Sequence, residues 1–172
     1  MRVIGVGNIL LKDEGIGVRV AEYIKEKRLL PPEIDVVDGG TGGIQLISII
    51  KDADCLIIID AVKGGGRPGN IYRFTIDDIP VNIAQKTSLH ELGLQEVFAL
   101  LDLSEGKRPE KVIIIGIEPG EVAYGMDLSP ELKAVVPKAA GVVVDEVKKI
   151  FKIKKKGRNF PTGYSHLHKR DN

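Results

Sequence analysis

Four short apolar runs rich in Val and Ile constrain the fold of this chain more than any other feature. They read RVIGVG, IDVVDGG, CLIIIDA and KVIIIGIEP, at residues 2–7, 34–40, 55–61 and 111–119. Continuous apolar runs of this length predict strands that are buried on both faces, as in a parallel sheet. Because helical stretches separate the runs, the sequence predicts an α/β fold with a doubly wound, mostly parallel twisted sheet and helices on both faces.

The intervening stretches carry the apolar spacing and the end signals of helices. One helical face groups Val18, Ala21, Tyr23 and Ile24, and a second groups Ile44, Leu46, Ile47 and Ile50. Ser88 and Glu91 form a capping box that predicts the start of a third helix. Ser129, followed by Pro130, predicts the start of a last helix, which Pro137 is expected to kink or split. The segment GNIYRFTID alternates by twos, which predicts an edge strand or a hairpin arm.

Composition and charge indicate one folded unit with a different C-terminal segment. With 172 residues, 43% of them hydrophobic, the chain is long enough to bury a core. We expect a single α/β domain over residues 1–151 and a basic, disordered tail over 152–172, whose His166 and His168 are at most a weak metal-binding pair. Most of the basic charge of that tail is balanced elsewhere, because the whole chain has a net charge of only +1. An acidic body of this kind is a poor nucleic-acid surface.

Further expectations concern the environment in which the protein works. The sequence has no signal-peptide pattern and no apolar run long enough to cross a membrane, which favours a cytoplasmic protein without membrane insertion. We also expect a monomer. The single cysteine, Cys55, lies within an apolar run and is expected to be an inert thiol of the core.

Acidic residues follow the predicted strands at the edge of the sheet where ligands of such folds bind. Asp13 and Glu14 come after the first run, whereas Asp38, Asp60 and Glu118 lie near the ends of the second, third and fourth runs. Glu118 precedes a proline and is expected to shape its loop rather than to act in catalysis. His90, the only histidine outside the tail, lies where it can reach the same edge.

The first glycine turn resembles a dinucleotide-binding fingerprint only in part. Position 10 is Leu where the fingerprint needs Gly, and the carboxylates of Asp13 and Glu14 would repel a pyrophosphate. A structural interpretation makes Asp13 the N-cap of the first helix and places Glu14 in its first turn. Asp60 has a structural alternative as well, in which its carboxylate bonds loop amides.

A functional interpretation remains open for Glu14, Asp60 and His90. Two carboxylates and one imidazole, with coordination positions left open, suit a divalent ion such as nickel, zinc or iron. The residues by themselves predict a metal-binding or carboxylate-rich α/β site and go no further.

A resemblance carries the interpretation beyond this point. The ordered motifs GVGNILLKDEGIG, DGGTGG, LIIIDAVKGG, SLHELGL and IIGIEP, within about residues 1–150, resemble those of the [NiFe]-hydrogenase maturation endopeptidases. The resemblance implies an enzyme that removes the C-terminal extension of the hydrogenase large-subunit precursor after nickel insertion. It implies that Glu14, Asp60 and His90 contact nickel, and that Asp38 lies on a loop that handles the substrate.

Two versions of the mechanism follow from the resemblance. In the favoured version nickel is carried by the substrate and acts as a recognition handle, while Asp38 or another carboxylate, Glu14 or Asp60, directs water at the peptide bond. In the other version the ion acts as a Lewis acid that lowers the pKa of a bound water. Two other functions stay open: a non-catalytic, metal-sensing maturation chaperone and a nucleotide-dependent oxidoreductase.

Overall fold

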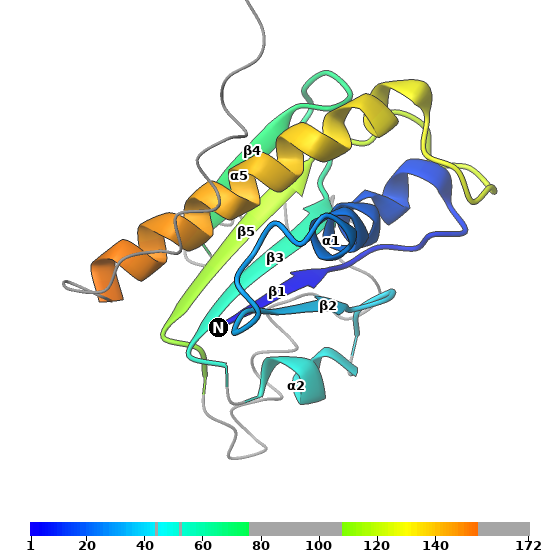
Figure 1. The fold of residues 1–172 in the computed structure, drawn as a ribbon. Coiled ribbons are helices and arrows are strands. Elements are labelled where there is room, and N and C mark those ends of the chain that lie inside the picture. Colours follow the sequence, from blue (N-terminus) through cyan, green and yellow to red (C-terminus); the bar gives the residue numbers. More distant parts are fainter. Residues whose placement is uncertain (44, 52, 76–107, 155–172) are drawn as a thin grey trace, which may run out of the picture.

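A five-stranded sheet forms the centre of the protein (Figure 1). The computed structural model describes residues 1–43, 45–51, 53–75 and 108–154. In these ranges the strand order is β2-β1-β3-β5-β4, with all neighbours parallel except β4, which runs antiparallel to β5. The strands are β1 (Arg2–Gly5), β2 (Asp35–Asp38), β3 (Cys55–Ala61), β4 (Ile71–Thr75) and β5 (Lys111–Ile117). The predicted mostly parallel α/β sheet is confirmed.

Helices pack against both faces of this sheet. The described helices are the short 3-10 helix η1 (Lys12–Gly15), α1 (Ile16–Glu26), α2 (Gln45–Ile50) and α5 (Pro130–Lys154). Figure 1 shows α1 and α5 lying across the same face, where they share a core with Ile57 and Ile59 of β3. On the opposite face, α2 packs with Leu56 and Ile58 of the same strand. β3 is therefore buried on both faces, as its sequence predicts.

The two edge strands differ in how well the sequence described them. β4 is an edge strand in this sheet, so the prediction from its alternating pattern is confirmed. β2 was expected to be buried on both faces, and this is wrong. Val36 and Val37 are only partly buried, and Asp35 and Asp38 are exposed. The reason is that β2 lies at the other edge of the described sheet and pairs with β1 alone.

The last helix begins as predicted but is not divided. Ser129 precedes α5, and its hydroxyl oxygen accepts a long hydrogen bond of 3.4 Å from the amide of Leu132. The helix runs without a break through Pro137, so of the two predicted outcomes the split does not occur, and the kink stays a prediction. Pro137 lies on the exposed side of the helix. Its neighbour Val136 is buried in the core and holds the helix in place.

Some predictions fall outside the described residues. The helix expected after Ser88, together with His90, belongs to 76–107, and the basic tail beyond residue 154 is also outside. Residues 152–154 form the end of α5. Cys55 is a buried free thiol in the core, as expected. Within the described residues, even α5 is too polar along its length to cross a membrane, and no other helix qualifies.

Candidate active site at the strand ends

The strand order reverses direction between β1 and β3. The chain leaves β1 toward β2 on one side, whereas β3 lies on the other side of β1. Ligands of open α/β sheets bind at such a reversal of strand order, beyond the carboxyl ends of the strands. In this protein η1 follows β1 and packs against β3 at this end of the sheet. The sequence-predicted Glu14 and Asp60 lie on these two elements.

Asp60 is a buried carboxyl group with one unsatisfied oxygen. Only 1% of the residue is exposed. Its Oδ1 accepts a hydrogen bond of 2.8 Å from the amide of Ala61, but among the described residues Oδ2 has no hydrogen-bond partner. Burial raises the pKa of Asp60 well above its usual value, the Ala61 amide partly opposes this shift, and the charge of Glu14 adds to it. The structural alternative, in which Asp60 bonds loop amides, explains one of its oxygens only.

Glu14 is held close to the sheet by the glycine turn after β1. The residue is buried, and a Cβ atom added to Gly7 would collide with the Glu14 carbonyl oxygen. Gly7 has a φ of 147°, which a residue with a side chain rarely adopts. The glycine therefore allows the turn and η1 to approach each other. η1, which carries Glu14, packs against β3, which carries Asp60, and the charge of Glu14 raises the pKa of Asp60.

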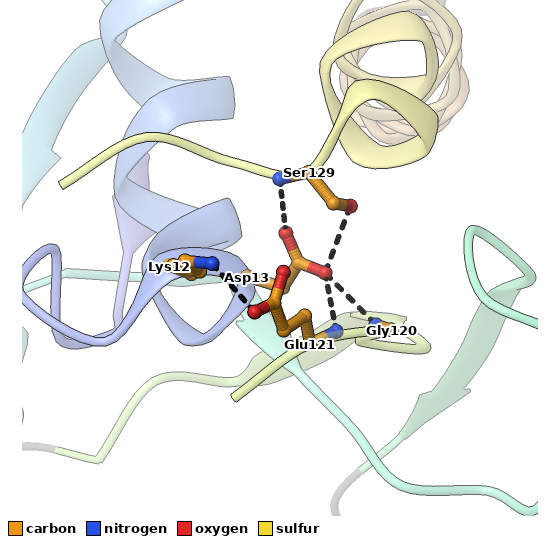
Figure 2. Close-up of polar contacts among 5 residues, drawn as sticks. All are labelled: Lys12, Asp13, Gly120, Glu121 and Ser129. Atoms are coloured by element: carbon orange, nitrogen blue, oxygen red, sulfur yellow. Dashed lines mark hydrogen bonds and ion pairs between the residues drawn. The ribbon is translucent and has the colours of Figure 1, made fainter. Parts of the chain in front are cut away.

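Asp13 does not cap α1, so this part of the structural interpretation is wrong. The N-cap of α1 is Gly15, which makes no side-chain capping bond, and Glu14 precedes it in η1. Figure 2 shows the Asp13 carboxylate directed instead at the segment between β5 and α5. It accepts four hydrogen bonds there: from the amides of Gly120, Glu121 and Ser129, and from the Ser129 hydroxyl. The sequence contains no local signal for partners 107 to 116 positions away.

Asp38 lies on a glycine-rich loop that is joined to the turn after β1. Its side chain is exposed, and its Oδ1 accepts a hydrogen bond of 2.7 Å from the Gly40 amide. Gly40 and Gly42 have positive φ values of 54° and 80°. The carbonyl oxygen of Gly40 in turn accepts a bond of 2.8 Å from the amide of Gly7. The predicted substrate-handling residue thus stands on a loop attached to the turn that supports Glu14.

Glu118 shapes a loop, as the sequence predicts. Its Oε2 accepts hydrogen bonds from the amides of Gly64 and Gly66, at 2.8 and 3.2 Å, and from the hydroxyl of Tyr72 at 2.7 Å. The bond to Glu118 raises the pKa of Tyr72, because ionisation would remove the donated proton. The role of Tyr72 had no sequence signal beyond its place in an alternating strand.

The glycines of the first turn serve packing between a helix and strands. A Cβ atom on Gly17 of α1 would collide with the carbonyl oxygens of Val6 and Ile59, and one on Gly5 would collide with Gly17. Leu10, at the position where a dinucleotide fingerprint needs glycine, is largely exposed. With η1 and its acidic residues following directly, this turn does not offer the cradle of backbone amides that a pyrophosphate needs.

The metal-binding trio is described only in part. Glu14 and Asp60 come together, but His90 lies outside the described residues. Within the ranges that the structure covers, no group of three His, Cys, Asp or Glu side chains is arranged to hold a metal ion. The buried oxygens of Glu14 and Asp60 are nevertheless ligands that suit a divalent cation, because a free Asp60 Oδ2 has no competing donor in the described residues.

Comparison with known proteins identifies the family. A family model described as hydrogenase maturation protease matches residues 18–146. The chain belongs to the hydrogenase maturation protease family. Hydrogenase expression/formation protein HupD of Rhodobacter capsulatus is 38% identical over 148 residues, which are 85% of this chain and 70% of HupD. The hydrogenase 2 maturation protease of Escherichia coli is 36% identical over 138 residues, 80% of this chain and 84% of that protein.

Solved structures agree with this assignment. The hydrogenase maturating endopeptidase HybD of E. coli superposes with a TM-score of 0.76 at 32% identity, covering 87% of this chain and 92% of HybD. The HybD maturation protease of Thermococcus kodakarensis has a TM-score of 0.63 at 29% identity and covers 87% and 97%. The resemblance drawn from the sequence motifs is confirmed, and this hydrogenase maturation protease is an endopeptidase of α/β fold.

Proposed function

We propose that this hydrogenase maturation protease removes the C-terminal extension from a [NiFe]-hydrogenase large-subunit precursor after nickel has been inserted. In this proposal nickel belongs to the substrate and serves as a recognition handle for Glu14, Asp60 and His90. Asp38 directs the water molecule that attacks the scissile peptide bond. Family membership supports the reaction class, and the two buried carboxyl groups on η1 and β3 support the residue assignment.

The observation that carries the assignment is the state of Asp60. A buried carboxyl oxygen without a hydrogen-bond partner costs folding free energy, because burial removes its water without replacing it. Such a cost is common where a group must bind something that the protein itself does not contain. A cation held by the substrate would satisfy the oxygen and favour the ionised form of Asp60. Glu14, close enough to raise the pKa of Asp60, would share the same cation.

The proposed trio would make recognition depend on the metal content of the precursor. Two carboxylates and one imidazole supply three ligands and leave further positions for groups of the substrate. Docking is then favourable mainly when both partners contribute ligands. Coupling of this kind has a typical size of about 1–3 kcal/mol, or roughly 5- to 150-fold in affinity. The protease would thereby distinguish loaded from unloaded precursor before cutting.

The proposed role of Asp38 is to guide hydrolysis. Its carboxylate accepts a proton from water as the water oxygen forms a bond to the peptide carbonyl carbon. The peptide C–N bond then breaks, and the leaving amine takes up a proton, so that one water is consumed per cut. The exposed position of Asp38 at the end of β2, on a loop with positive φ values at Gly40 and Gly42, fits a group that must meet an incoming chain.

The test compares cleavage of nickel-loaded and nickel-free precursor by intact enzyme and by Glu14→Gln, Asp60→Asn and His90→Ala. We expect the intact enzyme to shorten only the loaded precursor, and the three variants to leave it uncut while unfolding cooperatively. Glu118→Gln is the matched control, because it changes a buried carboxylate at a neighbouring strand end and should still cut. Equal cleavage of both precursors, or an active His90→Ala variant, would contradict the proposal that the enzyme recognises nickel in the substrate.

The cleavage assay, together with a thermal-shift measurement, separates the two remaining functions. A non-catalytic metal-sensing chaperone would bind the loaded precursor without changing its mass. A nucleotide-dependent oxidoreductase would be stabilised by NAD or NADP, so its melting temperature would rise with either nucleotide. Leu10 at the position of a fingerprint glycine, and the carboxylates of η1, argue against this last function.

We further propose that the protein acts in the cytoplasm as a monomer, without a nucleic-acid partner. The acidic balance of the sequence outside its basic C-terminal segment supports the last of these statements. Light scattering of the purified protein would test the oligomeric state, and fractionation of cells would test the location.

A further inference from the structure

We propose that Asp13 is a positioning residue, which fixes Glu14 in its working place by tying η1 to the segment between β5 and α5. This inference rests on the proposed function of Glu14. Asp13 itself does not touch substrate in the proposal, because it is fully buried and both its carboxylate oxygens accept hydrogen bonds from the protein.

The first observation is the concentration of donors on one side chain. Asp13 Oδ2 accepts bonds of 3.0 and 2.7 Å from the amides of Gly120 and Glu121, and one of 2.9 Å from the Ser129 hydroxyl. Its Oδ1 accepts a bond of 2.7 Å from the Ser129 amide. Hydrogen bonds to an ionised carboxylate are stronger than those between neutral groups. Figure 2 shows that these bonds reach both the start of α5 and the segment after β5.

The second observation is that the backbone of η1 is bound to the same segment. The amide of Lys12 donates to the Gly125 carbonyl oxygen at 2.8 Å, and that of Asp13 donates to the Glu121 carbonyl oxygen at 3.2 Å. The ammonium group of Lys12 also pairs with the Glu121 carboxylate. Lys12 has a φ of 49°, a strained value for a residue with a side chain, which the surrounding bonds hold in place.

The third observation is the shortness of the element that carries Glu14. η1 contains only four residues, so it has little internal hydrogen bonding of its own to fix its orientation. Glu14 follows Asp13 directly, and a shift of one backbone unit moves the next. Functional side chains must be held within about 0.5 Å of their productive position. The carboxylate of Asp13 therefore supplies rigidity that η1 lacks.

Glu118 provides an internal comparison. It too is a buried carboxylate that accepts bonds from two backbone amides and a hydroxyl group. Neither Glu118 nor its partners, which lie at residues 64–72, belong to η1, whereas Asp13 does. Loss of either carboxylate should reduce stability, but only loss of Asp13 should disturb Glu14. This difference separates a positioning role from a purely structural one.

The experiment measures single-turnover cleavage of nickel-loaded precursor with enzyme in excess, below the melting temperature of every variant. It yields a maximal rate and the enzyme concentration that gives half of it. We expect Asp13→Asn to lower the maximal rate about 10- to 100-fold, the scale of a misplacement near 1 Å, and to change the half-saturating concentration less than about threefold. Glu118→Gln should keep the maximal rate within about threefold of the intact enzyme.

Ser129 gives a second test if Asp13→Asn does not fold. Ser129→Ala removes one of the four bonds to Asp13 and should lower the maximal rate by a smaller factor, whereas Ser129→Thr retains the hydroxyl group and should restore it. An unchanged maximal rate in Asp13→Asn, or in Ser129→Ala where Asp13→Asn is unfolded, would overturn the inference. An equal fall in Glu118→Gln would also overturn it. If the intact enzyme leaves the loaded precursor uncut, the proposed function itself fails.

Discussion

Gly17 of α1 lies against the backbone carbonyl oxygen of Ile59, the residue that precedes Asp60 in β3. A side chain at position 17 would collide with this oxygen and with that of Val6. Helix α1 and strand β3 therefore approach each other closely beside the buried Asp60. The absence of a side chain on Gly17 is thus as much a part of the site as the acidic residues.

Gly17→Ala should lower the free energy of unfolding by about 1–3 kcal/mol, because backbone atoms rather than flexible side chains would have to move. Denaturant unfolding would measure the loss. Gly141→Ala is the matched control: Gly141 lies within α5 and an added Cβ meets nothing within 4 Å. That variant should be unchanged or gain about 0.4–1 kcal/mol. Similar losses in both variants would refute the packing argument.

Tyr72→Phe should cost about 1 kcal/mol of stability, because the Glu118 carboxylate loses one hydrogen-bond donor while remaining buried. The rate of precursor cleavage should not change. Tyr124→Phe is a suitable control, since Tyr124 is 92% exposed and should lose nothing measurable. If Tyr72→Phe slows cleavage without loss of stability, Glu118 belongs to the catalytic machinery after all.

Asp60→Asn should unfold at a higher temperature than the natural protein at neutral pH while losing cleavage. Burial raises the pKa of Asp60 in the folded protein above its usual value of 3.8. The folded state therefore binds the Asp60 proton more tightly than the unfolded state does. The contribution of Asp60 to the free energy of unfolding is fully present below the usual pKa and is lost as pH rises through the folded-state pKa. Asparagine cannot ionise, so the variant does not lose this stability at neutral pH. Thermal unfolding between pH 3 and 8 should show a difference in melting temperature between the variant and the natural protein that shrinks toward pH 3.

Asp38→Ala should leave the fold intact and slow or misdirect cleavage. The side chain is exposed and its one described bond goes to the Gly40 amide of its own loop, so little stability depends on it. Mass spectrometry of the product would reveal both the rate and the cut position. Asp35→Ala removes an exposed carboxylate at the opposite end of β2 and should cut normally. A normal rate and product mass for Asp38→Ala would remove this residue from the mechanism.

Deletion of residues 155–172 should preserve folding and cleavage, because their sequence is rich in charge and lacks an apolar pattern. The truncated chain ends where α5 ends, so no described helix is shortened. Denaturant unfolding and the cleavage assay would be compared with those of the full chain. A broad, non-cooperative transition would indicate that the segment packs on the domain.

The fold was predictable because its signals are local. Runs such as CLIIIDA are apolar at every position except Asp60, which is typical of a central strand covered on both faces, and Ser129 with Pro130 marks a helix start within two residues. The burial of β2 was overestimated because Val36 and Val37 indicate a strand but not its position in the sheet. Strand order depends on contacts between distant segments, which no local pattern contains.

In the candidate site, too, local sequence signals were predictive and contacts between distant segments were not. The positions of Glu14, Asp38 and Asp60 follow from the rule that parallel strands bring their carboxyl ends to one edge. The role of Asp13 did not follow, because an acidic residue before a helix normally reads as a cap. Its actual partners are contributed by the last third of the chain. Tyr72 and Glu118, separated by 46 positions, were hidden for the same reason.

The bond between Asp13 and Ser129 can form only late in the synthesis and folding of the chain. It joins residues 116 positions apart, so the ribosome must make most of the domain before this bond can form. At translation rates of about 5–20 residues per second this interval is roughly 6 to 23 seconds. Contacts of such long range also form late in folding, since closing a long loop costs entropy first. A nascent or truncated chain that has passed β3 but lacks α5 would carry these acidic residues without the contacts to Ser129 that hold Asp13 in the folded domain.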